Sequence, residues 1–311
     1  MCSVLGIDTS NYTTSAAIWQ NGKITQNKQL LPVKEGQLGL RQSDAVFHHV
    51  QQLPGILEPL LKEHPAMEAI GVSARPRDLE GSYMPCFTVG SGTAKALSDA
   101  LDIPLYIFSH QAGHIAAALF SCNRMDLRKR QFLAYHVSGG TTEAILVSPD
   151  PEHVLHETIV SQSLDLKGGQ AVDRVGLMLG LPFPAGKELE RLALQCNETF
   201  KIKPTMKGFD FCLSGIENQC RTLLQKDYPK PYIARYCLES LSAALSRSCE
   251  LLLQEYGDLP VVFAGGVMSN RLIRQQMENR FNAFFAEPEF ARDNAAGIAV
   301  LAAIQHGESL C

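Results

Sequence analysis

The chain has 311 residues, of which 45% are apolar and 19% are charged, and its formal net charge is −4. This length is sufficient for two ordinary domains or one large domain, each with an apolar core. The small negative charge excludes a strong overall attraction to nucleic acid, so any nucleic-acid contact requires a local basic patch.

The nine cysteines are scattered along the chain without a Cys-x-x-Cys motif. Because the first residues also lack the pattern of a signal peptide, this cysteine usage predicts reduced thiols and a cytoplasmic protein. No apolar segment has the length that is needed to span a membrane, so we expect no membrane partner.

The chain opens with a strand, a polar turn and a second strand. Residues 3–7 and 15–19 are apolar, residues 8–14 are rich in hydroxyl groups, and residues 20–23 are typical of a hairpin turn. A hydroxyl-rich turn can present backbone N–H groups and hydroxyls to an anion. Candidate phosphate-binding residues are Asp8, Thr9 and Ser10, although an ordinary polar hairpin has the same composition.

The same pattern recurs farther along the chain. Residues 132–137 and 144–147 are apolar, and the turn between them reads Ser-Gly-Gly-Thr-Thr-Glu. Gly139 and Gly140 permit a ligand to approach the backbone closely, because they have no β-carbon. A repeat on the scale of a whole domain indicates duplication, with two similar domains that face each other across a cleft.

Between the two turns, strands and helices alternate, which is typical of an α/β layer. Capping residues and amphipathic spacing predict a helix over residues 43–53, an interruption at Pro54-Gly55, and a continuation to residue 63. His48 and His49 are adjacent and therefore point in different directions. We expect both of them to be surface or partner-binding residues rather than metal ligands.

A pair of histidines follows the apolar strand predicted at residues 103–108. Ser109 is suited to cap the alanine-rich helix behind it. His110 and His114 lie four residues apart on one helix face, where two imidazoles can share a metal ion. A chain with nine histidines also produces such a pair by chance, so a metal site requires a third ligand.

Two later segments carry candidate ligand-binding groups. Asp173 lies in an otherwise apolar helix, where its carboxylate is either a surface group or an acceptor for a ligand hydroxyl. Gly265 and Gly266 follow an apolar strand and precede a helix, an arrangement that is typical of an anion or nucleotide site. Near the end of the chain, Asp293 or Asn294 is suited to cap the last helix.

Taken in chain order, these motifs resemble the TsaD family of tRNA adenosine threonylcarbamoyltransferases, once called glycoproteases. The resemblance covers nearly the whole chain. It rests on residues 6–10, 110–114, 137–141, 169–180, 209–215, 264–267 with Asn270, and 293–294.

The resemblance implies an α/β, two-lobed, actin-like and Hsp70-like (ASKHA) fold with duplicated phosphate loops and a nucleotide cleft between the lobes. The lobes are expected at residues 1–130 and 131–311, with the last helix packing back on the N-terminal lobe. Within this fold, Asp8, Thr9, Ser10, Gly265 and Gly266 are expected in the phosphate and nucleotide loops.

The resemblance also implies a reaction and its site. The family transfers a threonylcarbamoyl group from threonylcarbamoyl-AMP to the adenosine 3′ of a tRNA anticodon and releases AMP. The metal ligands, for one divalent iron or zinc ion, are expected to be His110, His114 and Asp293. The positions that match substrate contacts are Val137, Ser138, Gly139, Gly140, Thr141, Asp173, Gly186 and Asn270. Implied partners are tRNA, through a local contact, a smaller paralogue, and ATPase proteins of the same pathway.

The chain departs from the family pattern at several positions. Ala112 stands where the family has Glu in His-x-Glu-Gly-His, and Arg75 and Arg77 replace glycines of a Gly-Pro-Gly turn. Other departures are Thr141 for His, Gln170 for Glu, and Glu217 for Lys. These changes leave two alternatives open: a regulatory nucleotide-binding paralogue, or a carbamoyl transferase that acts on a small molecule. A metallopeptidase is disfavoured, because no His-Glu-x-x-His motif supplies a general base.

Overall fold

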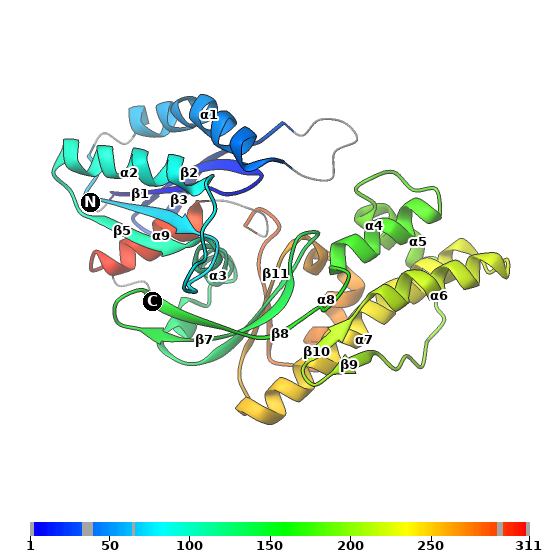
Figure 1. The fold of residues 1–311 in the computed structure, drawn as a ribbon. Helices are drawn as coiled ribbons and strands as arrows, with labels where there is room; N and C mark the ends of the chain where they lie inside the picture. The colour runs from blue at the N-terminus through cyan, green and yellow to red at the C-terminus, as the bar shows by residue number, and fades with distance from the viewer. Residues whose placement is uncertain (1–2, 33–39, 64–65, 291–294, 309–311) are drawn as a thin grey trace. The chain divides into compact units, whose positions relative to one another are not determined.

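The structure, a computed structural model, describes residues 3–32, 40–63, 66–290 and 295–308. It contains two compact units, each built on a five-stranded sheet with helices (Figure 1). The first unit comprises Met1–Arg130, Ser148–Glu157 and Glu289–Cys311, and the second comprises Gln131–Val147 and Thr158–Pro288. The chain first passes from the first unit to the second after Arg130, the position at which the sequence analysis placed the boundary between the lobes. Residues 148–157 and 289–308 belong to the first unit.

The sheet of the first unit has the strand order β3-β2-β1-β4-β5. Strands β1 to β3 are antiparallel, and β4 and β5 run parallel to β1. Asn21 and Gly22 have φ angles of 50° and 78°, so the predicted hairpin turn between β2 and β3 is confirmed. The strands are β1 (Ser3–Thr9), β2 (Thr13–Gln20), β3 (Lys23–Leu30), β4 (Ala69–Arg75) and β5 (Leu105–Ser109).

Helix α9 lies against this sheet at van der Waals distance. A β-carbon added to Gly6 would lie 2.5 Å from the backbone nitrogen of Ala299, so only glycine allows the approach. Gly297 packs equally closely on Gly113 of α3. The helices of this unit are α1 (Gln42–Glu63), α2 (Phe87–Leu101), α3 (His110–Ser121), the 3₁₀ helix η1 (Met125–Lys129) and α9 (Ala296–Gln305).

Helix α1 corrects two expectations. It continues without interruption through Pro54 and Pro59, because its buried side chains, among them Leu53 and Leu57, pack into the core and offset the hydrogen bonds that proline removes. His49 is fully buried rather than on the surface.

The sheet of the second unit has the order β12-β11-β6-β7-β8. An antiparallel pair, β6 and β7, is extended by β11, which runs parallel to β6, and by β12 beyond it. The first sheet repeats this topology strand for strand, so the duplication expected from the two turns is confirmed. The strands are β6 (Phe132–Val137), β7 (Thr142–Asp150), β8 (Val154–Gln162), β11 (Val261–Ala264) and β12 (Ala283–Phe285).

The long helix α7 forms the centre of the core of this unit, with its leucine side chains buried among those of the sheet. A short antiparallel pair, β9 (Thr205–Lys207) and β10 (Asp210–Cys212), forms a separate two-stranded sheet, with Phe211 bridging to Ser163 just after β8. No helix in the described part of the chain is long and apolar enough to cross a membrane. The remaining helices are α4 (Gly168–Met178), α5 (Gly186–Ala193), α6 (Ser214–Gln225), α7 (Lys230–Tyr256), η2 (Gly266–Ser269) and α8 (Arg271–Glu278).

Candidate functional site

Polar side chains gather at the carboxyl ends of three parallel strands of the first unit. Asp8 lies near the end of β1, Ser73 lies near the end of β4, and His110 follows β5 directly. Ligand sites in open α/β sheets lie at this edge, because neighbouring strands end there and deliver their next residues to one place. The strand order therefore brings together three residues that are far apart in the sequence.

The carboxylate of Asp8 orients the ring of His110. Asp8 is fully buried, and its Oδ1 atom lies 2.8 Å from Nδ1 of His110 and accepts a hydrogen bond from the hydroxyl of Ser73. With Nδ1 as the donor, Nε2 of His110 presents its lone pair away from Asp8. That Nε2 atom lies 3.0 Å from Nε2 of His114. The structure thus brings the two histidines together, and it adds Asp8 as the group that orients His110.

Some hydroxyls of the first polar turn form hydrogen bonds with other parts of the protein. The hydroxyl of Thr9 donates to the carbonyl of Cys86 and accepts from the backbone of Gly90. The hydroxyl of Ser10 is buried and has no partner among the described residues. Ser10 is therefore a candidate ligand-binding residue of this turn.

His49 holds this turn in place through two hydrogen bonds. Its Nε2 atom lies 2.8 Å from the carbonyl oxygen of Ser10, and its Nδ1 atom lies 2.8 Å from the hydroxyl of Thr14. Burial lowers the pKa of His49, although the hydrogen bond to Ser10 and the charge of Asp8 partly oppose this effect. A carbonyl oxygen can only accept, so Nε2 of His49 is the donor in the hydrogen bond to Ser10.

A buried glutamate lies at the N-terminus of α3. Ser109 caps this helix, since its hydroxyl accepts from the backbone N–H of Ala112, and the same hydroxyl donates to Oε2 of Glu157 across 3.3 Å. The other carboxylate oxygen of Glu157 is buried without a partner in the described chain. Burial, and then the negative charge of Asp78, raise the pKa of Glu157 to about 8.

In the second unit, the predicted Ser-Gly-Gly-Thr turn packs against the N-terminus of α4. Ser138 closes the turn through backbone and side-chain hydrogen bonds with Thr141. A β-carbon on Gly169 would lie 2.6 Å from the backbone nitrogen of Gly139, so glycine is needed where the helix meets the turn. Gly139 and Gly140 are themselves exposed. Exposed turn amides beside a helix N-terminus are suited to bind an anion.

The Gly-Gly loop after β11 lies against the same turn. Gly265 has a φ angle of 98°, and a β-carbon there would lie 2.3 Å from the carbonyl oxygen of Val137. Asn270 caps α8, because its Oδ1 atom accepts from the backbone N–H groups of Leu272 and Ile273. The side-chain amide NH₂ of Asn270 is then the group that remains for a ligand.

Asp173 forms a hydrogen bond that the sequence alone does not predict. Its Oδ1 atom accepts from the backbone N–H of Ala185 at 2.8 Å, which fixes the loop just before Gly186 begins α5. The second carboxylate oxygen remains available to a ligand hydroxyl.

Asp293, the expected third metal ligand, lies outside the described residues, as does Asn294. In residues 3–32, 40–63, 66–290 and 295–308, no three His, Cys, Asp or Glu side chains form a metal-binding group.

Two of the departures from the family pattern are held in ion pairs. Arg75 binds Asp78 at 2.6 Å, and Glu217 binds both Arg174 and Arg221. The local sequence gave no signal for the roles of Ser73, His49 and Glu157.

The fold and these turns define the actin-like (ASKHA) class of duplicated α/β proteins. The solved structure of full-length HypF in its phosphate- and nucleotide-bound form has a TM-score of 0.63 and 14% identity, over 98% of this chain and 46% of that chain. The (R)-2-hydroxyglutaryl-CoA dehydratase component A of Acidaminococcus fermentans has a TM-score of 0.58 and 18% identity, over 99% and 100% of the two chains. At these identities the likeness shows the fold alone.

Sequence comparison identifies the family within this class. Residues 24–300 match the family model of tRNA N6-adenosine threonylcarbamoyltransferase. Enzymes of that name from Thermus thermophilus and Chlorobium chlorochromatii are each 30% identical, over 97% and 98% of this chain and 93% of their own lengths. The chain belongs to the tRNA N6-adenosine threonylcarbamoyltransferase family of transferases.

Proposed function

We propose that this protein transfers the threonylcarbamoyl group of threonylcarbamoyl-AMP to the adenosine 3′ of a tRNA anticodon, and that His110 and His114 bind a divalent metal ion for this reaction. Family membership supports the reaction. The observation that carries the site is the pair of Nε2 atoms 3.0 Å apart, with Asp8 behind His110.

These residues fit a metal ion. The two Nε2 atoms lie 3.0 Å apart, which is close enough for both to bind one ion at the usual metal–nitrogen distance of about 2.0–2.1 Å. A ligating histidine usually donates its other N–H to a carboxylate, as His110 donates to Asp8. Asp293 is proposed as the third ligand: it lies four residues before Gly297, which packs on Gly113 beside His114. When bound, the ion would polarise the carbonyl of the group being transferred.

The second unit supplies the nucleotide contacts in this proposal. The amides of Gly139 and Gly140, beside the N-terminus of α4, bind the phosphate of the adenylate. Asp173 accepts from a hydroxyl of the substrate, and the side-chain amide of Asn270 donates to it. In the transfer, the exocyclic nitrogen of adenosine forms a bond to the carbamoyl carbon, the bond from that carbon to the phosphate oxygen breaks, and AMP leaves. The proton of the amine passes to solvent.

The test is a transfer assay with unmodified tRNA, threonine, bicarbonate, ATP and the partner proteins of the family. We expect modified adenosine from the native chain and at least a 100-fold lower rate with His110→Ala. The metal content of His110→Ala, measured by elemental analysis, is expected to fall as well. His153→Ala is the matched control, because this exposed histidine is remote from β5 and α3 in the sequence.

Absence of product, under conditions in which the Thermus thermophilus relative is active, would overturn the proposal. The protein would then be a regulatory paralogue or a transferase with a small-molecule acceptor. Cytoplasmic location belongs to the same proposal because tRNA is the substrate, and the smaller paralogue belongs to it because the family resemblance implies this partner.

A further inference from the structure

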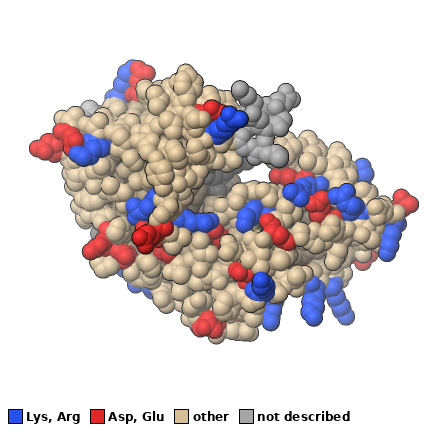
Figure 2. Space-filling view, in the orientation of Figure 1, with Lys and Arg blue, Asp and Glu red and all other residues tan. Residues whose placement is uncertain are grey.

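A row of unpaired lysines lies on one side of an extended segment that leads into β9. Lys201, Lys203 and Lys207 are exposed together with Thr205, whereas the even-numbered residues between them are half-buried. Alternate residues of an extended chain point to the same side and lie about 6.6 Å apart. Within the described part of the chain, these three ammonium groups form no ion pair or hydrogen bond. Lys and Arg side chains project from the lower right edge in Figure 2, near the position of β9 in Figure 1.

The acidic residues on the neighbouring helices do not neutralise this row. Glu217 of α6 binds Arg174 and Arg221, at 3.1 and 2.7 Å. Glu239 of α7 binds Arg235 at 2.8 Å. Asp210 is the cross-strand partner of Lys207, and its carboxylate accepts a hydrogen bond from the backbone of Gln162. The row of three lysines therefore keeps a net positive charge, although the whole chain is slightly acidic.

Aromatic rings adjoin the start of the row. The ring of Phe200 lies 5.0 Å from that of Tyr232 and 5.3 Å from that of Tyr236, measured between centroids. Tyr228 lies 4.9 Å from Tyr232 and is 42% exposed. Unpaired bases of RNA stack on aromatic side chains that are placed next to cationic groups.

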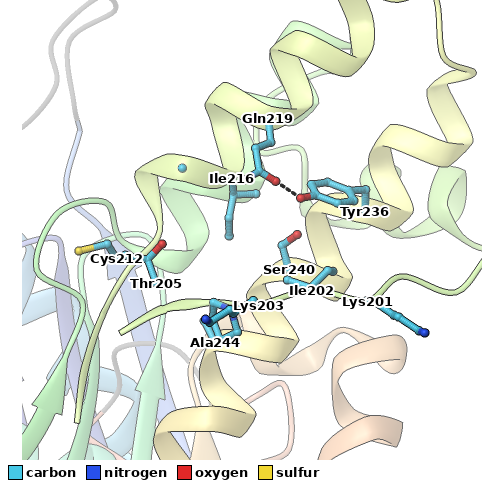
Figure 3. Close-up of a pocket in the computed structure, with 12 residues that line it drawn as sticks. Lys201, Ile202, Lys203, Thr205, Cys212, Ile216, Gln219, Tyr236, Ser240 and Ala244 are labelled. Carbon is cyan, nitrogen blue, oxygen red and sulfur yellow. Dashed lines mark hydrogen bonds between the residues drawn. The ribbon is translucent and has the colours of Figure 1, made fainter. Parts of the chain in front are cut away.

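A polar pocket of about 240 Å³ opens between the lysine segment and helices α6 and α7. In Figure 3 the hydroxyl of Tyr236 donates to the side chain of Gln219, Ser240 projects toward them from α7, and the Lys201 side chain extends away from the pocket. Ser240 is 6% exposed. Burial raises the pKa of Tyr236, and a hydrogen bond between the Ser240 and Tyr236 side chains partly opposes this effect. The pocket thus offers amide and hydroxyl groups to a flat polar ligand, and Lys201 and Lys203 are among the residues that line it.

We propose that this face of the second unit binds a single-stranded or loop segment of RNA. The phosphates bind Lys201, Lys203 and Lys207, and one unstacked base enters the pocket beside Gln219 and Ser240. An acidic peptide would match the lysines but would leave the aromatic rings and the pocket without partners. The inference rests on the proposed function only for the identity of the RNA as tRNA, since binding is measured without transfer.

The test measures the affinity of the full chain for an unmodified tRNA transcript at several salt concentrations. The triple variant Lys201→Ala/Lys203→Ala/Lys207→Ala is expected to bind at least about tenfold more weakly at 0.1 M salt. The slope of log affinity against log salt should fall by about 2, because three phosphate contacts are lost. A triple Lys→Arg variant should keep both values. The matched control, Lys23→Ala/Lys62→Ala/Lys95→Ala, removes the same charge from the first unit.

The pocket is tested separately with Gln219→Ala. Because this change removes a base contact and no phosphate contact, affinity should fall several-fold while the salt slope stays unchanged. A fully paired RNA duplex should compete poorly with tRNA, since it has no unstacked base to place in the pocket.

An equal loss of affinity in the control triple, or no loss in the Lys201 triple, would overturn the inference. Equal competition by the duplex would also overturn it, because binding would then depend on charge alone. Failure of the proposed function gives a different result: the native chain binds tRNA through this face and yields no modified adenosine.

Discussion

Nδ1 of His110 lies 2.8 Å from Oδ1 of Asp8, although 102 positions separate the two residues in the sequence. The substitution Asp8→Asn keeps the size of the side chain and removes its charge. We expect the affinity for Zn²⁺ or Fe²⁺ to fall about 10- to 100-fold, because a neutral partner makes the His110 ring less basic and holds it less firmly. Titration against a competing chelator measures this change.

Asp99→Asn is the control for that experiment, since Asp99 is exposed and forms an ion pair with Lys95. Equal metal affinity for Asp8→Asn and the native protein would show that Asp8 supports the strand ends without acting on the histidines.

The raised pKa of Glu157 predicts that the free energy of unfolding depends on pH. Burial and the charge of Asp78 raise the pKa of its carboxyl from 4.5 to about 8 in the folded protein. The folded state therefore holds the proton more tightly than the unfolded state. The resulting stabilisation is complete below pH 4.5 and is lost as the pH rises to about 8. Its upper bound is on the order of 5 kcal/mol at 1.36 kcal/mol for each pKa unit.

Urea unfolding of the native protein and of Glu157→Gln, from pH 5 to pH 9, checks this expectation. The free energy of unfolding of the native protein relative to the variant should decline with pH and become constant above pH 8. A difference that stays constant or rises with pH would contradict the raised pKa.

Because α3 and α9 pack closely together, we expect that Gly297 does not tolerate a larger side chain. A β-carbon on Gly297 would lie 1.8 Å from the carbonyl oxygen of Gly113, so Gly297→Ala has to separate two buried helices. We expect a loss of about 3 kcal/mol or more in the free energy of unfolding. Gly92→Ala in α2 is the matched control: nothing lies within 4 Å of its added β-carbon, and it should stabilise the helix by up to about 1 kcal/mol. Chemical denaturation of both variants measures the contrast.

Two substitutions of Asn270 distinguish its helix-capping role from a ligand-binding role. Asn270→Ala removes the cap of α8 and should cost about 1 kcal/mol of stability. Asn270→Asp keeps an oxygen that can cap the helix but replaces the amide donor, so stability should remain while the affinity for AMP falls. Calorimetric titration with AMP, alongside thermal unfolding, tests this. Unchanged AMP affinity in Asn270→Asp would limit Asn270 to the cap.

The sequence by itself determined the local features of this protein. Hydroxyl-rich turns between apolar strands predicted the two strand–turn–strand units. The spacing of His110 and His114 predicted their common helix face, and Asn21-Gly22 predicted a hairpin. These features depend on residues that are close in the chain, so turn chemistry and side-chain periodicity are sufficient to predict them.

Only the tertiary structure decided which distant groups meet. The parallel order of β1, β4 and β5 places Asp8 and Ser73 beside His110, and the fold of the first unit brings Glu157 to the cap of α3. His49 was expected on the surface, but it is buried because α1 packs this side toward the first turn, where the His49 ring contacts Ser10 and Thr14. Such contacts depend on strand order and helix packing, which join residues many positions apart and leave no periodic signal in the local sequence.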